Sequence, residues 1–148
     1  MVLFQRNRDE WQKLLDDETR IPGAVEETLR YWAPSQYQGR VLTDDVTAHG
    51  VTMPKGSRVL LLTASANRDE REYDDADRFD IDRTSHVAVG FGHGLHFCLG
   101  AALARLEGRI GLEEFARRFP RYEIDEANLR RVHMSNVHGF ASVPFAAV

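Results

Sequence analysis

The sequence predicts an α+β fold that is mainly helical with small β-sheets, and three observations carry this prediction. Apolar residues recur at helical spacing between Leu99 and Phe119, and again between Ile21 and Trp32. From Arg40 onward, short runs rich in branched residues are separated by Gly and Pro-Lys-Gly, a pattern typical of strands joined by tight turns. With 148 residues, 43% of them hydrophobic, the chain has the size and apolar content of one domain with a core.

The N-terminal part is predicted to be helical. Residues 8–15 have the pattern of the end of a helix. A second helix is expected to begin at Ile21-Pro22, because proline suits the first helical turn, and to end at residue 31 or 32, before Ala33-Pro34. We therefore expect two helices before the first strand.

The middle of the chain is predicted to form a small sheet followed by an irregular segment. The runs VTAHG, VTMPKG and RVLLLT are candidate strands, and residues 63–68 are a candidate short helix. Residues 69–85 are acidic and poor in aliphatic side chains. Because this segment is long for a connection, it is either a solvated loop or a meander that specific polar contacts hold in place.

The C-terminal part is predicted to contain the longest helix and then more strands. Apolar residues at Leu99, Leu103, Leu106 and Ile110, continuing towards residues 115 and 119, give the strongest helical pattern of the chain. The tail holds three candidate strands, YEI, LRRVHM and VHGFASVPF. The last two are expected to form a hairpin.

Composition and charge narrow the classes of partner. The net charge is −4, and the charges are interspersed, so we expect no nucleic-acid partner. The one cysteine, Cys98, excludes an internal disulfide and a zinc site built from several cysteines. The opening MVLFQRNRDEW lacks the apolar run of a secretory signal, and no later run approaches a membrane span. We expect a cytoplasmic protein whose partner is a small molecule or another protein.

Cys98 lies in a glycine-rich stretch, GFGHGLHFCLGAALARLE, just before the predicted long helix. The free N–H groups and partial positive charge of a helix N-terminus favour a thiolate, which suits a nucleophile or a metal ligand. The glycines allow positive φ or close approach to a flat group. The alternative for a lone cysteine is a buried small hydrophobic side chain.

The segment from Phe91 to Gly100, FGHGLHFCLG, is similar to the haem-binding signature of the cytochrome P450 monooxygenases. This resemblance implies that Cys98 is the axial thiolate ligand of the iron in haem b, iron protoporphyrin IX. It also implies that the haem lies against Phe91, Gly92, His96, Cys98 and Gly100, with Phe91 beside the sulfur and His96 donating to a propionate. Arg40 falls where members of the family place an arginine against a propionate.

Glu27 and Arg30 are spaced to pair across one helical turn. A helical wheel places both away from the apolar stripe of their helix, and so predicts a solvated surface pair. However, AVEETLRY resembles the ExxR helix of the same family, and ANRD and FDIDR follow at the expected interval. The resemblance implies a buried structural triad of Glu27, Arg30 and Arg83 that pins the acidic meander.

The resemblance further implies a reaction and partners. Members of the family insert one oxygen atom from O2 into a small organic substrate, with NAD(P)H electrons delivered by a ferredoxin or a reductase. Gln36, Asn136 and Val137 fall where the family lines its substrate pocket, whereas the residues alone favour turn and edge-strand positions. Arg105 and Arg109 are either docking charges for an acidic electron donor or solvated helix charges.

The resemblance covers nearly the whole chain but only about the last third of the family. We therefore expect residues 1–148 to form a single partial domain, the C-terminal haem-ligating portion, without the distal helix that activates oxygen. The alternatives are a haem-binding or electron-transfer module, and a non-catalytic truncated remnant that needs a partner chain. Surfaces that face the missing helices are expected to expose a large apolar patch.

Overall fold

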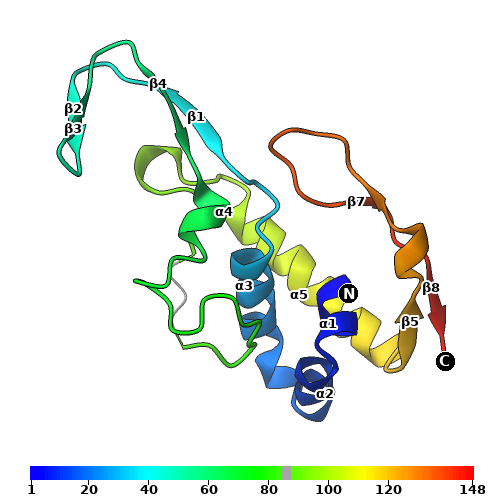
Figure 1. Cartoon of the computed structure of the whole chain (residues 1–148). Helices are drawn as coiled ribbons and strands as arrows, with labels where there is room; N and C mark the ends of the chain where they lie inside the picture. Colours follow the sequence, from blue (N-terminus) through cyan, green and yellow to red (C-terminus); the bar gives the residue numbers. More distant parts are fainter. Residues whose placement is uncertain (85–87) are drawn as a thin grey trace.

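A computed structural model of the chain describes residues 1–84 and 88–148 (Figure 1). Its helices are α1 (Val2–Arg6), α2 (Arg8–Asp16), α3 (Ile21–Tyr31), α4 (Thr63–Ala66) and α5 (Ala101–Arg118), with short 3-10 turns at Glu18–Arg20, Gly94–His96 and Glu126–Asn128. Its strands are β1 (Gln38–Val41), β2 (Val46–Ala48), β3 (Val51–Met53), β4 (Arg58–Leu61), β5 (Tyr122–Ile124), β6 (Arg130–Arg131), β7 (Phe140–Ser142) and β8 (Phe145–Ala147). The mixture of helices and small sheets confirms the predicted fold class.

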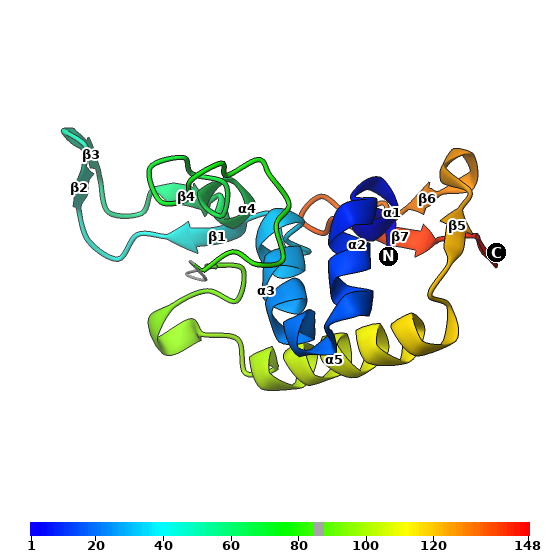
Figure 2. The same cartoon turned by 90° about the horizontal axis from the view of Figure 1, so that it is seen from below.

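The predicted N-terminal helices are present. The helix over residues 8–15 is α2, and Asn7, with φ −130° and ψ 70°, separates it from α1. Helix α3 has Pro22 in its first turn and ends at Tyr31. Figure 2 shows α2 and α3 side by side above α5, which runs across beneath them.

The strands of the described residues pair as two-stranded antiparallel sheets. Strands β1 and β4 pair with Arg40 opposite Val59, and the β2–β3 hairpin extends this arm away from the helices (Figure 1). The predicted C-terminal hairpin is β6–β7. A further strand, β8, pairs with β5 and was not predicted, because its partner lies more than twenty residues away in sequence.

The hydrophobic core lies where α1, α2, α3, the second half of α5 and β5 meet. Leu14, Ile21 and Ala24 are at most 1% exposed. The indole of Trp11 packs against the rings of Phe4 and Tyr122, each with a centroid distance of 5.4 Å. Burial of these aromatic side chains joins the two ends of the chain into one core.

Helix α5 has two apolar faces. Ala101, Leu112 and Ala116 are buried. At about 100° per residue, the stripe formed by Leu103, Leu106 and Ile110 lies about 150° from that face. These side chains, together with Leu99 just before the helix, are 44% to 103% exposed. The periodicity therefore predicted the helix, but the predicted stripe is the exposed one. These exposed side chains give α5 an apolar outer face.

The acidic segment is a meander with buried side chains rather than a solvated loop. Tyr73, Ala76, Phe79 and Ile81 are at most 4% exposed. The segment has few aliphatic residues, but aromatic rings supply the burial: Phe79 packs edge-on against Phe4 with a centroid distance of 5.4 Å. Residue 85, the end of the predicted segment, lies outside the described residues.

In the part of the chain that the structure describes, no helix combines the length and apolar character needed to cross a bilayer.

Candidate functional site

The loop around Cys98 is held by its own backbone. The N–H of Cys98 donates to the carbonyl of Phe91 at 2.9 Å, and its carbonyl accepts from the N–H of Ala101 at 3.2 Å, where α5 begins. Gly92 and Gly94 have φ of +75° and +69°, which side-chain-bearing residues rarely adopt. Cys98 is a free, exposed cysteine, so the alternative of a buried thiol is wrong.

A cavity of about 450 Å³ lies beside this thiol. Its lining comes from α3, from the segment that enters β1, and from the cysteine loop. The residues that line it are Glu26, Leu29, Pro34, Ser35, Gln38, Arg40, Ala88, Gly90, Phe91, His96 and Cys98. The structure thus brings Phe91, His96, Cys98 and Arg40 to one cavity. Among the described residues, Gly92 and Gly100 belong to the loop without lining the cavity.

Arg40 lies in β1 at the edge of this cavity. Its Nη1 donates to the neighbouring carbonyl of Gly39 at 2.8 Å, and the side chain is otherwise exposed. It is therefore a cationic donor with further N–H groups directed to solvent or to a ligand.

Phe91 is held from the side of α5. The Arg105 guanidinium lies 4.8 Å from the centroid of the Phe91 ring, and its Nη2 donates to Glu26 Oε2 at 3.1 Å. The hydrogen bond to Glu26 raises the pKa of Arg105. Arg109 pairs with Glu113 at 3.4 Å. Both basic side chains of α5 that the sequence analysis named are therefore paired with carboxylates of this chain.

Glu27, Arg30 and Arg83 meet behind the meander. Arg30 Nε donates to Glu27 Oε2 at 2.7 Å, and Arg83 Nε lies 3.3 Å from the same oxygen. Glu27 is 0% and Arg30 2% exposed, so the helical-wheel expectation of a solvated pair is wrong. The wheel failed because the meander covers this face: Asp80 N–H donates to Glu27 at 3.0 Å, and Arg30 Nη1 donates to the Ala76 carbonyl at 2.9 Å.

Gln36, Asn136 and Val137 are adjacent. The N–H of Gln36 donates to the carbonyl of Asn136 at 2.9 Å, and Ser35 forms an antiparallel bridge with Val137. The structure therefore joins the segment after α3 to the loop before β7. In the described part of the chain, these three residues lie outside the lining of the cavity beside Cys98.

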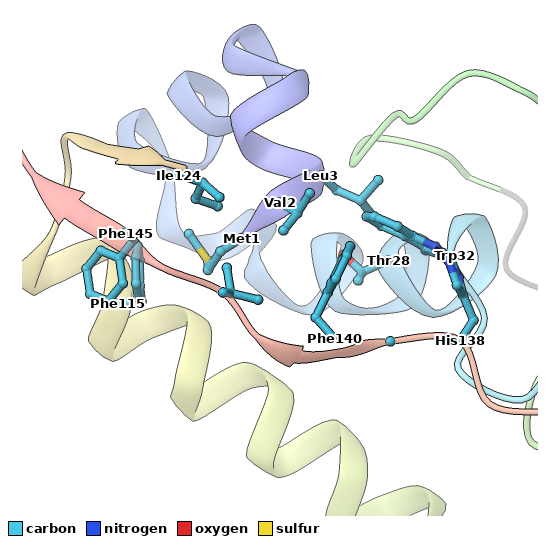
Figure 3. Close-up of a pocket in the computed structure, with 12 residues that line it drawn as sticks. Met1, Val2, Leu3, Thr28, Trp32, Phe115, Ile124, His138, Phe140 and Phe145 are labelled. Atoms are coloured by element: carbon cyan, nitrogen blue, oxygen red, sulfur yellow. Dashed lines mark hydrogen bonds between the residues drawn. The ribbon is translucent and has the colours of Figure 1, made fainter. Parts of the chain in front are cut away.

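A second cavity of about 450 Å³ lies between α1, α3, the end of α5 and the C-terminal strands. Figure 3 shows its largely apolar lining, which includes Val2, Phe140 and Phe145. Its one titratable side chain among the described lining is His138, whose Nε2 lies 2.7 Å from the indole nitrogen of Trp32. Burial, and then the charges of Arg131 and Arg68, lower the pKa of His138.

Asn67, to which no sequence pattern assigns a role, lies between the buried triad and the cysteine loop. Its Oδ1 accepts from the N–H of Val89 at 2.8 Å, and its backbone carbonyl accepts from Arg30 Nη1 at 2.8 Å. The only sequence signal was its position in ANRD. In the described ranges, no three His, Cys, Asp or Glu side chains gather in a way that could hold a metal ion.

The site is thus an exposed thiol that faces a partly apolar cavity, with a cationic arginine and a histidine at its edge. The chain belongs to the cytochrome P450 family, whose model matches residues 6–142. It is 46% identical over 146 residues to cytochrome P450 130 of Mycobacterium tuberculosis, covering 98% of this chain and 36% of that protein. It is 41% identical over 140 residues to the steroid C26-monooxygenase of Mycolicibacterium smegmatis, covering 94% and 35%.

Solved structures of the family share the fold. The chain matches P450BioI, solved with an acyl carrier protein that carries hexadec-9Z-enoic acid, with a TM-score of 0.95 and 33% identity. That match covers 99% of this chain and 38% of the other. The structure therefore has part of the cytochrome P450 fold, and the chain spans about a third of the length of the curated relatives it matches.

Proposed function

We propose that this chain is the C-terminal, haem-ligating portion of a haem-thiolate monooxygenase, with residues 1–148 as a single partial domain. The observation that carries the proposal is the cavity that gathers Cys98, Phe91, His96 and Arg40. The family of the chain supports the same role.

The donor set fits haem b. A cysteine thiolate is a soft ligand suited to haem iron. Leu29, Pro34, Ala88 and Phe91 give the cavity apolar walls for a flat macrocycle. Arg40 and His96 supply the N–H donors that carboxylates such as propionates accept.

The side chains gathered at the cavity have separate tasks in this proposal. Cys98 would hold the iron as a thiolate ligand, and the exposed position of its thiol leaves it open for ligation. Phe91, held in place by Arg105, covers the sulfur side of the cavity. Arg40 and His96 orient the group through its carboxylates. When bound, haem supplies the oxygen-activating chemistry, which the protein positions and tunes.

In the complete enzyme, one oxygen atom from O2 is inserted into a small organic substrate. Electrons come from NAD(P)H through a ferredoxin or a reductase. The name of the Mycolicibacterium relative, a steroid C26-monooxygenase, supports an oxygenation of this kind. Gln36, Asn136 and Val137 form part of the substrate wall in this proposal, because they join two segments near the cavity.

A haem-binding or electron-transfer module is the second candidate function. The observation that favours it is the set of groups at the cavity, because Cys98, Arg40 and His96 are of the kinds that hold haem. A reconstituted chain that binds haem through Cys98, yet yields no oxygenated product with an electron donor, would favour this candidate.

Haem reconstitution tests the proposal. We expect the reduced carbon-monoxide complex of the unmodified chain to show the red-shifted band of thiolate ligation, because Cys98 is free and faces the cavity. Cys98→Ser removes the thiolate and should abolish this band. Arg109→Gln, on the exposed part of α5, is the control and should retain it. Failure of the unmodified chain to take up haem would overturn the proposal for this polypeptide.

A further inference from the structure

Asn67 is fixed in the frame that surrounds the buried triad. It is 0% exposed. Its N–H donates to the carbonyl of Thr63 at 3.0 Å, and its carbonyl accepts from Arg30 Nη1 at 2.8 Å. The backbone of Asn67 therefore cannot shift without breaking a charge-assisted hydrogen bond to the most deeply buried cation of the described residues.

The side chain of Asn67 faces the start of the cysteine loop. Its Oδ1 accepts from the N–H of Val89 at 2.8 Å. A Cβ added at Gly90 would lie 3.5 Å from its Nδ2. Within the described ranges that Nδ2 has no hydrogen-bond partner, so the bond to Val89 is the polar contact that the side chain makes there.

Backbone hydrogen bonds continue from this contact to Cys98. The N–H of Gly92 donates to the carbonyl of Val89 at 2.9 Å, and the N–H of Cys98 donates to the carbonyl of Phe91 at 2.9 Å. Between these two bonds the chain turns through the positive φ of Gly92. Since each bond fixes the next part of the loop, a displacement of Val89 changes the place of Cys98.

We propose that Asn67 is a positioning residue for Cys98. By holding the N–H of Val89 against the frame of the triad, it sets where the cysteine loop begins and how the thiol faces the cavity. Without this acceptor, the part-buried N–H of Val89 loses its partner. The loop can then adopt other conformations without breaking a hydrogen bond. The proposal rests on the proposed function in one respect, namely that the Cys98 thiol ligates haem iron.

Amide hydrogen exchange of the haem-free chain tests the positioning directly. Asn67→Ala removes the acceptor, and we expect the N–H groups of Val89, Gly92 and Cys98 to exchange roughly tenfold faster. Asn67→Asp keeps an acceptor oxygen that can replace Oδ1 in the bond to Val89, so it should restore slow exchange. Thr63→Val is the matched control. Thr63 is also buried, and the variant removes the hydrogen bond from its hydroxyl to the Ser35 carbonyl at 3.1 Å, which lies outside the cysteine loop.

Haem reconstitution supplies the second measurement. In Asn67→Ala, the fraction of carbon-monoxide complex with the thiolate band should fall severalfold relative to Thr63→Val, and Asn67→Asp should recover it. The proposal is overturned if Asn67→Ala matches Thr63→Val in both exchange and band. If Asn67→Ala does not fold, Asn67→Ser is judged by the same criteria. Absence of haem uptake by the unmodified chain would count against the proposed function, while exchange still decides the role of Asn67.

Discussion

Glu27 is a single carboxylate that fastens α3 to the meander. Its two oxygens accept from the guanidinium groups of Arg30 and Arg83 and from the N–H of Asp80. All of its acceptor capacity is used inside the protein, at a point with 0% exposure. Replacing this residue therefore leaves two cations without their counter-charge.

The cost of losing this charge should be large. Glu27→Gln keeps the shape of the side chain but removes its charge, and we expect unfolding free energy to fall by about 3–5 kcal/mol in urea denaturation. Glu126→Gln is the matched control, because Glu126 forms an exposed pair with Arg6 at 2.7 Å. It should change the unfolding free energy far less, because solvent screens an exposed pair. Equal losses in the two variants would show that burial of the triad does not decide stability.

The burial of Glu27 marks a limit of reasoning from local sequence. The helical wheel considers one helix, whereas the groups that cover Glu27 lie 53 and 56 residues further along the chain. Only the resemblance of AVEETLRY and FDIDR to a known family indicated the triad. Cys98 is the opposite case, because glycine spacing, the single thiol and the following helix are all local signals.

At the scale of elements, α3 touches the meander at its first turn. A Cβ added at Gly23 would lie 2.9 Å from the backbone carbonyl oxygen of Ile81. Such a distance is shorter than a carbon–oxygen contact allows, and the obstacle is backbone rather than a flexible side chain. Glycine is needed at this position for close approach between two segments.

The same substitution should have opposite effects in the two long helices. Gly23→Ala forces α3 and the meander apart, and we expect a loss of about 1–3 kcal/mol of unfolding free energy. Gly111→Ala, in α5, meets nothing within 4 Å. It should gain up to about 1 kcal/mol, because alanine favours a helix. Thermal unfolding of both variants checks this, and stabilisation by Gly23→Ala would contradict the close contact.

The sequence predicts the position of helix α5, but it does not predict which face of this helix is buried. The period of Leu99, Leu103, Leu106 and Ile110 identifies α5, yet the buried residues of this helix are Ala101, Leu112 and Ala116, and α3 packs at Gly108. A helix with apolar residues on both sides gives no local signal of which side is buried. The strand β8 was missed for a related reason, since its pairing with β5 joins distant segments.

At the scale of the whole molecule, the chain has part of a known fold and an exposed apolar helix face. The chain superposes on a family structure with a TM-score of 0.95 while covering 38% of it. The outer face of α5 exposes Leu103 at 58% and Ile110 at 47%. Contiguous apolar surface of this kind promotes association.

Removing apolar groups from this face should reduce self-association. We expect Leu103→Gln with Ile110→Gln to lower the oligomeric fraction severalfold in sedimentation velocity, and to reduce the binding of a hydrophobic dye. Val46→Gln with Val51→Gln is the matched control, since these exposed valines lie on the remote β2–β3 hairpin. If both double variants associate alike, the α5 face is not the contact.

The exposed thiol of Cys98 has a practical consequence. It is the one cysteine of the sequence, so a sulfhydryl reagent has a single place to react. An alkylating label attached there would occupy the sulfur that the iron needs, and ligation would in turn shield the sulfur from the label. The fraction of chains that resist labelling therefore equals the fraction of chains whose sulfur is ligated.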